Sequence, residues 1–172
     1  GSDWVRGQIG RDGSMVAHAP ALDLSVFCAR SPTRGNSSVV IGTIGRKGKT
    51  KGYEYFLQAI ELLPDLSRVR VLVASPEPGE VPVPHKVPAE RLLARSEQAM
   101  AEFYSRCDIF VLPSRVEGFP LPPLEAMACG CAVVVTACGG VSDYAQDGVN
   151  CLVVPPADPH ALAKAVWTLC QD

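Results

Sequence analysis

The residues best suited to chemistry are two cations and two carboxylates that lie in separate segments. The first segment, residues 42–52, reads GTIGRKGKTKG and places Arg46 and Lys51 five positions apart. Two cations on one glycine-rich turn are suited to gripping neighbouring phosphate groups, with the arginine in bidentate contact. By charge alone, a solvated basic turn is the commoner explanation. The choice between the two depends on the rest of the chain.

The same segment contains Gly48-Lys49-Thr50, which is similar to the end of a Walker A loop. That motif requires a glycine five residues before Gly48, and this position holds Thr43. The spacing argues against a nucleoside triphosphate site of this kind. A P-loop ATPase or kinase therefore remains only as a minor alternative.

The second segment, residues 115–125, reads RVEGFPLPPLE and carries Glu117 and Glu125. It follows a predicted strand and precedes a predicted helix, where open α/β sheets bind their ligands. The start of a helix attracts an anion through its free amides. Because proline has no N–H, the available amide donors are those of Gly118, Phe119, Leu121 and Leu124. A carboxylate repels phosphate, so we expect the two glutamates to accept hydrogen bonds from hydroxyl groups of the same ligand. A phosphate with two hydroxyl-bearing groups describes a nucleotide-sugar.

Each glutamate also has a plainer interpretation. Glu125 is favoured in a first turn by the helix dipole, by about 0.3–1 kcal/mol, and Glu117 is compatible with an ordinary surface charge. A glycosidase also needs two carboxylates, but it has no use for an anion-binding helix end.

The elements that position these segments alternate between predicted strands and helices. Apolar β-branched runs predict buried strands, whereas apolar residues at helical spacing and end signals predict helices. Strands are predicted at 39–44, 68–74, 108–112, 132–136 and 150–154, and helices at 53–63, 96–106, 122–130 and 158–169. Residues 75–88 hold five prolines and are predicted to be a loop, with a brief extended piece at 85–87. This order predicts an α/β, Rossmann-like parallel sheet with helices on both faces.

Composition limits the class of protein. The chain has 172 residues, 47% of them hydrophobic and 20% charged, which suits a globular domain with an attached linker. We assign residues 1–35 to an interdomain linker or the edge of a neighbouring domain, and 36–172 to the folded domain. A net charge of −2 gives no support for a nucleic-acid partner. No apolar run approaches the ~18 residues of a transmembrane helix.

Seven cysteines are scattered along the chain and several lie among apolar residues. We expect buried, reduced thiols in a cytoplasmic protein, because oxidising compartments favour paired cysteines. The spacing of Cys129 and Cys131 does not match a zinc site, and no metal is expected.

Residues 117–134, EGFPLPPLEAMACGCAVV, resemble the signature of the retaining glycosyltransferases of family 4 (glycosyl transferases group 1), usually EGFGLPPLEAMAxGxPVV. Residues 45–52 resemble that family's GRxxxxKG motif. Residues 103–114, 137–143 and 148–155 continue the pattern in the same order. The resemblance covers roughly residues 39–170.

The resemblance implies a GT-B architecture, in which two Rossmann-like domains bind the substrates between them. This chain is similar only to the C-terminal, donor-binding half, so we expect a fragment that lacks the N-terminal acceptor domain and is inactive alone. The implied reaction transfers a sugar from a nucleotide-diphosphate donor, such as a UDP- or GDP-sugar, to an acceptor hydroxyl with retention of configuration. No cofactor is expected, since no Asp-x-Asp motif occurs, and peripheral membrane association of the full enzyme is compatible with the family. A non-catalytic nucleotide-binding module is the alternative, because fold does not imply activity.

The resemblance also implies roles for single residues. Arg46 and Lys51 would neutralise the donor diphosphate, Glu117 would bind hydroxyls of the transferred sugar, and these three form the predicted catalytic set. Glu125 would accept hydrogen bonds from the ribose. The predicted donor-binding set is completed by Gly45, Gly118, Phe119, Pro120 and Leu121. Pro120 replaces the family's usual glycine and removes one amide, and the residues that bind the base, expected within 75–95, are not identified.

Overall fold

A single parallel sheet forms the centre of the molecule. The computed structural model describes residues 22–29, 38–77 and 81–171. In these residues six strands run parallel in the order β3-β2-β1-β4-β5-β6. They are β1 (Val39–Ile44), β2 (Val69–Ser75), β3 (Ala89–Leu93), β4 (Ile109–Leu112), β5 (Ala132–Thr136) and β6 (Leu152–Val154). β2, β4 and β5 are almost wholly buried and mostly apolar, as expected for strands covered on both faces, with Arg70 of β2 as an exposed exception.

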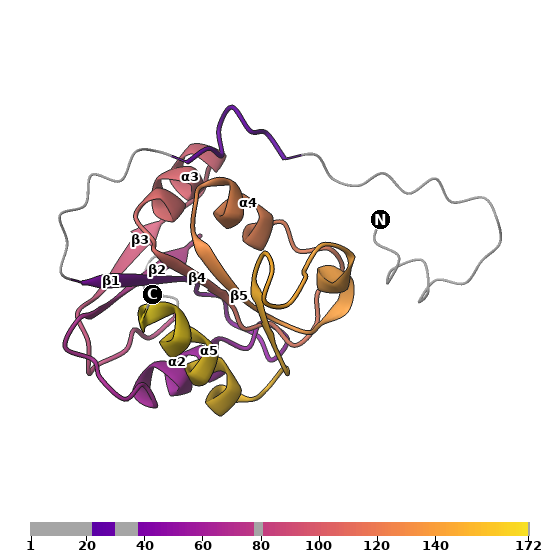
Figure 1. Ribbon diagram of the computed structural model, residues 1–172. Helices are drawn as coiled ribbons and strands as arrows, with labels where there is room; N and C mark the ends of the chain where they lie inside the picture. Colours follow the sequence, from indigo (N-terminus) through magenta and orange to yellow (C-terminus); the bar gives the residue numbers. More distant parts are fainter. Residues whose placement is uncertain (1–21, 30–37, 78–80, 172) are drawn as a thin grey trace.

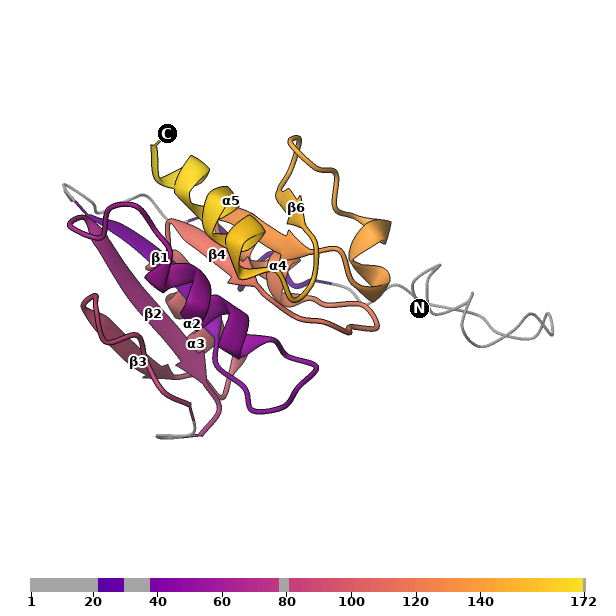
Figure 2. The same cartoon turned by 90° about the horizontal axis from the view of Figure 1, so that it is seen from below.

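Helices cover both faces of this sheet. On one face lie α2 (Tyr53–Glu61) and α5 (Pro159–Gln171), packed against each other, and on the opposite face lie α3 (Glu97–Ser105) and α4 (Pro122–Ala128) (Figure 1). Figure 2 shows α2 and α5 side by side across the strands. A separate cluster of buried apolar side chains fills each of the two layers. The predicted Rossmann-like sheet with helices on both faces is confirmed.

The predicted helix signals are present in the structure. The Ser96 hydroxyl accepts a hydrogen bond from the Ala99 amide at 3.2 Å, and the Asp158 carboxylate accepts one from the Ala161 amide at 2.9 Å. Both are side-chain caps of the kind that satisfies the first free amides of a helix. The sequence therefore fixes where α3 and α5 begin.

The sequence prediction missed β3. Residues 85–87, predicted as an extended piece, form no strand, and the strand lies at Ala89–Leu93 instead. β3 pairs only with β2 at the edge of the sheet and is largely exposed, so its sequence, AERLL, lacks the apolar run that marks the other strands. The preceding prolines also favoured a loop.

Residues 22–29 pack against the α3–α4 layer. Phe27 is only 3% exposed, and its ring centroid lies 6.2 Å from that of Tyr104. The remainder of the predicted linker, residues 1–21 and 30–35, lies outside the described residues. The segment we assigned to a linker thus contributes a side chain to the core of the described domain.

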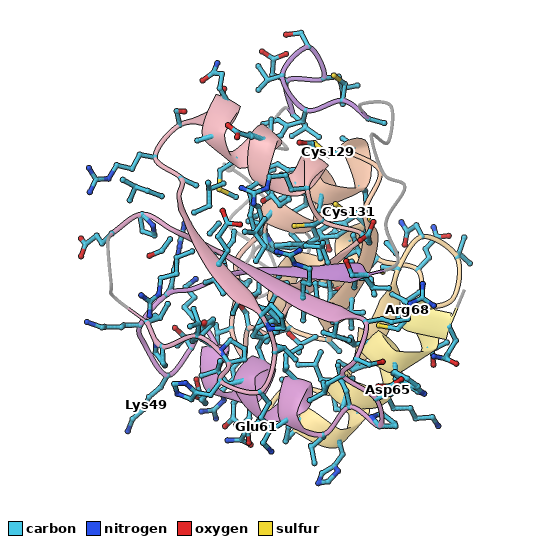
Figure 3. All side chains as sticks on the ribbon, turned by 90° about the vertical axis from the view of Figure 1, so that its left-hand side faces the viewer. Lys49, Glu61, Asp65, Arg68, Cys129 and Cys131 are labelled. Carbon is cyan, nitrogen blue, oxygen red and sulfur yellow. The ribbon has the colours of Figure 1, made fainter. Side chains whose placement is uncertain are left out.

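The cysteines match the expectation of thiols. None of the seven forms a disulfide with a described residue, and five of them are buried, whereas Cys28 is exposed and Cys170 is half-buried. Cys129 and Cys131 lie inside the layer around α4 (Figure 3). No helix in the described part of the chain is both long and apolar enough to cross a membrane.

Candidate functional site

The candidate site lies where the strand order reverses. β1 and β4 are neighbours in the sheet, but the chain leaves β1 towards β2 and leaves β4 towards β5. Such a switch point opens a crevice at the carboxyl ends of the strands, which is where doubly wound sheets bind their ligands. A cavity of about 770 Å³ occupies this position and is lined by the predicted side chains Arg46, Lys51, Glu117, Pro120 and Glu125.

Two loops meet at this cavity because Gly52 has no side chain. Gly52 adopts a φ of 63°, and a Cβ atom there would lie 2.0 Å from the Pro113 carbonyl oxygen. The Arg115 amide also donates a hydrogen bond to the Thr50 carbonyl at 2.8 Å. The loop after β1, which carries the cations, is thereby held against the loop after β4, which carries Glu117.

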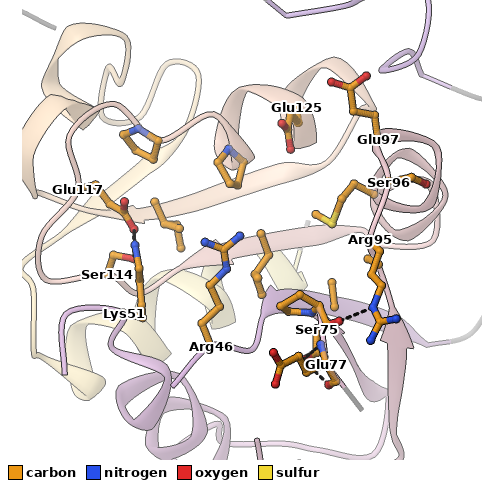
Figure 4. A pocket seen from close by; sticks show the side chains of 18 of the residues that line it. Arg46, Lys51, Ser75, Glu77, Arg95, Ser96, Glu97, Ser114, Glu117 and Glu125 are labelled. Carbon is orange, nitrogen blue, oxygen red and sulfur yellow. Dashed lines mark hydrogen bonds and ion pairs between the residues drawn. The ribbon is translucent and has the colours of Figure 1, made fainter. Parts of the chain in front are cut away.

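One end of the cavity, here called the cationic end, consists of Arg46, Lys51, Ser114 and Glu117. Lys51 Nζ lies 3.0 Å from Glu117 Oε1, and the Ser114 hydroxyl donates to the same oxygen at 2.7 Å. Among the described residues, Glu117 Oε2 has no protein partner. Arg46 is exposed and points into the cavity between the two ends (Figure 4). One carboxylate oxygen is therefore held by the protein, while the other remains for a ligand.

The backbone around Glu117 is held by the loop that follows β5. Gly139 adopts a φ of 53°, and a Cβ there would lie 1.7 Å from the Glu117 carbonyl oxygen. The Gly140 amide donates to the Gly118 carbonyl at 2.9 Å. Thr136, at the end of β5, donates its hydroxyl to the Ser114 carbonyl. These contacts fix the loop on the side away from the cavity.

The other end, here called the helical end, is formed by α3 and α4. The Tyr104 hydroxyl donates a hydrogen bond to Glu125 Oε2 at 2.7 Å. Glu125 is half-buried and lines the cavity, and Phe27 and Met100 line the same region. Burial raises the pKa of the Glu125 carboxyl, and the hydrogen bond from Tyr104 opposes that rise. Here again the protein holds one carboxylate oxygen, and the second has no hydrogen-bond partner among the described residues.

Sequence reasoning missed several lining residues beyond Glu125. Ser75 ends β2, Arg95 follows β3, and Glu97 opens α3, and all of them line the cavity together with Glu77. The Arg95 guanidinium donates to the Pro76 carbonyl at 2.8 Å, which links these two loops (Figure 4). Their position at or just after the carboxyl end of a strand is the signal that would have identified them. For Arg95 and Glu97 this signal was absent because β3 was not predicted.

Four predicted residues lie beside the cavity rather than in its lining: Gly45, Gly118, Phe119 and Leu121. A Cβ on Gly45 would lie 2.4 Å from Val81 Cγ2, so this glycine serves close packing. The Phe119 ring packs against Tyr144, with the centroids 5.6 Å apart, and the Tyr144 hydroxyl donates to the Pro120 carbonyl. These residues shape the loop that carries Glu117.

The start of α4 offers few amides to an anion, as its two prolines implied. α4 has only seven residues, and its first two are prolines, which supply no amide. The Glu125 amide donates within the helix, to the Leu121 carbonyl at 3.0 Å. The side-chain cations that line the cavity are Arg46 and Lys51 from the loop after β1, and Arg95 after β3.

The residues similar to a Walker A motif lie away from the cavity lining. Lys49 is exposed and extends away from the body of the molecule (Figure 3). α2 begins at Tyr53, so Gly48-Lys49-Thr50 does not open a helix as a P-loop does. Among the described residues, no group of three His, Cys, Asp or Glu side chains could hold a metal ion.

Comparison with known families gives one match that covers most of the chain. The model described as "Glycosyl transferases group 1" matches residues 38–172. A D-inositol 3-phosphate glycosyltransferase from Corynebacterium urealyticum is 34% identical over 152 residues, which are 79% of this chain and 36% of the relative. The lipopolysaccharide core biosynthesis mannosyltransferase LpcC from Rhizobium leguminosarum bv. viciae is 33% identical over 148 residues, 77% of this chain and 41% of the relative. The chain thus spans well under half the length of these curated relatives.

Solved structures share the fold. The C-terminal domain of LpcC from Francisella tularensis, a glycosyl transferase group 1 protein, superposes with a TM-score of 0.72 at 26% identity, covering 88% of this chain and 89% of that one. Sucrose-phosphate synthase from Thermosynechococcus elongatus gives a TM-score of 0.75 at 23% identity, covering 88% and 42%. HepE from Anabaena, in complex with UDP and glucose, gives 0.70 at 19% identity, covering 88% and 46%. The last two likenesses concern the fold alone.

Proposed function

Because the chain belongs to the glycosyl transferases group 1 family, we propose that it is the donor-binding domain of a retaining glycosyltransferase. The proposed enzyme transfers a hexose from a nucleotide-diphosphate sugar to an acceptor hydroxyl. One observation carries the proposal: the cavity at the switch point holds two cations from one loop and two carboxylates that each keep an oxygen for a ligand. A diphosphate flanked by a ribose and a sugar has the charges and hydroxyls that match this arrangement.

Each lining side chain has a role in this proposal. Arg46 and Lys51 stabilise the negative charge that develops on the diphosphate as its bond to the anomeric carbon breaks, which is electrostatic stabilisation of the transition state. Glu117, held by Lys51 and Ser114, accepts a hydrogen bond from a hydroxyl of the transferred sugar. Glu125 accepts one from the ribose. The acceptor oxygen forms the new bond to the anomeric carbon on the face that the diphosphate leaves, which retains the configuration, and the acceptor proton passes to the departing diphosphate.

The adjacent loop residues retain the donor-binding roles that the family pattern implies. Gly45 lets the loop after β1 pack closely, and the backbone of Gly118, Phe119 and Leu121 contacts the sugar and phosphates in this proposal. Pro120 lines the cavity and, because it lacks an N–H, offers no amide to the donor. No metal is required, because the two cations supply positive charge at the diphosphate.

Several features of the whole protein belong to the same proposal. The chain spans 36% and 41% of the two relatives described above, and we propose that an N-terminal acceptor domain supplies the rest of the active site. Seven cysteines with no disulfide among the described residues support a reducing compartment, and we propose the cytoplasm. Association of the full enzyme with the surface of a membrane is compatible with this location.

Isothermal titration calorimetry of the 172-residue chain with UDP, GDP and ADP, and with one sugar conjugate of each, tests the proposal. We expect weak binding of at least one nucleotide and no sugar transfer by this chain alone. A chain that is folded by circular dichroism but binds none of these ligands would contradict the proposal. ATP hydrolysis that depends on Mg²⁺ and is lost in Lys49→Ala would instead favour the P-loop alternative.

A further inference from the structure

The hydroxyl of Tyr104 contacts Glu125 from the side away from the cavity. It donates to Oε2 at 2.7 Å, a short hydrogen bond to a charged acceptor, and it comes from α3 to a side chain on α4. Tyr104 does not line the cavity, whereas Glu125 does. A ligand therefore meets the carboxylate and not the tyrosine.

Aromatic packing fixes the position of this hydroxyl. The Tyr104 side chain is fully buried, and its ring centroid lies 5.2 Å from Phe103 and 5.3 Å from Phe110. Phe27 packs against the same ring from residues 22–29, outside the segment that the family model matches. Rings packed on several sides leave the tyrosine little freedom to move, so its hydroxyl holds Glu125 in one orientation.

The electrostatics of the pair agree with this geometry. Burial raises the pKa of Tyr104 well above its ordinary value, with the nearby Glu125 charge as the next cause, so the hydroxyl remains a donor. Burial raises the pKa of Glu125, Tyr104 lowers it, and Glu97 on α3 raises it slightly. Phe27 adds no charge. The other charged side chains that line the same cavity are Arg46, Lys51, Glu77, Arg95 and Glu117.

We propose that Tyr104 is a positioning residue, which orients Glu125 so that Oε1 alone faces the ribose hydroxyls of the donor. This inference rests on the proposed function, because Tyr104 supports the contact between Glu125 and the ribose that the proposed function includes. It predicts that the tyrosine hydroxyl affects only ligands that carry ribose hydroxyls. It also predicts an effect on the pH dependence of binding.

The test compares Tyr104→Phe, which keeps the ring packing, with the parent chain and with Tyr55→Phe on α2. No hydrogen bond joins the Tyr55 hydroxyl to the described residues, so this variant is the matched control. Three ligands are compared. The first is whichever of UDP, GDP and ADP binds the parent most tightly, the second is the 2′,3′-dideoxy form of that nucleotide, and the third is inorganic pyrophosphate. Binding is measured by calorimetry over a range of pH, and circular dichroism checks the fold.

The parent is expected to prefer the ribose ligand over its dideoxy counterpart by about tenfold, the order of a hydrogen bond to a charged group. Tyr104→Phe should reduce this preference by about threefold or more, without changing pyrophosphate affinity. Ribose-dependent binding is present when Glu125 is ionised and is lost as pH falls through its pKa. Without the tyrosine bond that pKa rises further, so the loss should begin at a higher pH in Tyr104→Phe. Tyr55→Phe should match the parent.

Two results overturn the inference while the proposed function stands. One is a parent chain that binds the ribose and dideoxy ligands equally, which also removes the ribose role of Glu125 but leaves nucleotide-sugar binding as the proposed function. The other is a folded Tyr104→Phe that retains both the preference and the pH midpoint of the parent. A parent chain that binds no nucleotide overturns the proposed function and the inference with it.

Glu125→Gln serves as a second variant, because its amide oxygen still accepts a hydrogen bond from Tyr104 while the ionisable group is absent. This variant should bind the ribose ligand less tightly than the parent and without this pH step.

Discussion

The cationic end and the helical end of the cavity are built in different ways. At the cationic end, Lys51 and Glu117 extend from loops and keep 31% and 17% of their side chains exposed. At the helical end, Glu125 stands on a helix and is held by Tyr104, a fully buried tyrosine in an aromatic cluster. The first end depends on charge, and the second on a fixed hydrogen bond.

The difference reflects what each end has to recognise. Charges attract a diphosphate over several ångströms, so the exact orientation of a lysine matters little, and the ligand itself supplies the compensating charge. A hydrogen bond to a hydroxyl needs the acceptor within about 3 Å and at the correct angle, which favours a rigid support. We therefore expect changes at the cationic end to affect binding, and changes under the helical end to affect stability as well.

The largest expected effect is on stability, in Tyr104→Ala. This variant removes a buried ring from the cluster with Phe103 and Phe110 and leaves Glu125 without its donor. Loss of a buried aromatic side chain lowers the free energy of unfolding by ~3–5 kcal/mol. Urea unfolding should show a lower midpoint, whereas Tyr55→Ala on the half-exposed side of α2 should show a much smaller change. Equal effects in the two variants would contradict the contrast between the ends.

The next effect is on binding, in Lys51→Ala. The variant removes one cation and leaves the Glu117 carboxylate uncompensated beside the diphosphate. Affinity for a nucleoside diphosphate should fall about 10- to 100-fold, the order of a charge-assisted hydrogen bond. Stability should change by no more than ~1 kcal/mol, because the ion pair is partly exposed.

Lys49→Ala is the matched control for this loop. Lys49 is exposed, lies two residues from Lys51 and does not line the cavity. Its loss should alter affinity by less than about twofold at moderate salt, since surrounding ions screen an exposed charge. A larger loss of affinity in Lys49→Ala than in Lys51→Ala would show that Lys49, and not Lys51, binds the phosphates.

A smaller effect is expected from Glu125→Gln at the helical end. Affinity for a nucleoside diphosphate should fall about fivefold to tenfold, because a neutral amide accepts a weaker hydrogen bond from the ribose. Affinity for inorganic pyrophosphate should stay the same. The control is Glu54→Gln, another acid in the first turn of a helix, but on α2 and exposed. If pyrophosphate affinity also falls in Glu125→Gln, this carboxylate does not act on the ribose.

The smallest expected effect concerns stability and pH. Burial raises the pKa of Glu125 above its ordinary value of 4.5. A raised pKa contributes stability that is complete below the ordinary value and is lost as pH rises through the folded value. Glu125→Gln has no such loss, so its melting temperature should exceed that of the parent near neutral pH, by an amount that shrinks towards pH ~4. Glu54→Gln should instead be neutral or slightly less stable, because a helix dipole favours a first-turn charge.

The sequence predicted the cationic end better than the helical end, and the reason is physical. Arg46, Lys51 and Glu117 are charged residues in glycine-containing loops after strands, and both the loops and the strands are visible as local patterns. The pairing of Lys51 with Glu117 across 66 positions depends on the adjacency of β1 and β4, which the order of elements did not fix.

At the helical end the decisive contacts have no local signal. Glu125 was found, but its partner Tyr104 lies 21 positions earlier and looks like an ordinary apolar position of a helix. Phe27 lies in a segment that was predicted to be a linker. Its short apolar pieces between polar residues give no sign that the segment packs against the α3–α4 layer. The edge strand β3 was missed because exposed strands carry no apolar run.

The most direct test of the central claim is a map of backbone amide chemical shifts of the isotope-labelled chain as a nucleoside diphosphate is added. The account predicts shifts at both ends, at Lys51 and Glu117 and also at Tyr104 and Glu125. Inorganic pyrophosphate should shift only the cationic pair. Shifts that lie outside the cavity, or a nucleotide that leaves the helical end unchanged, would contradict the claim that one donor spans both ends.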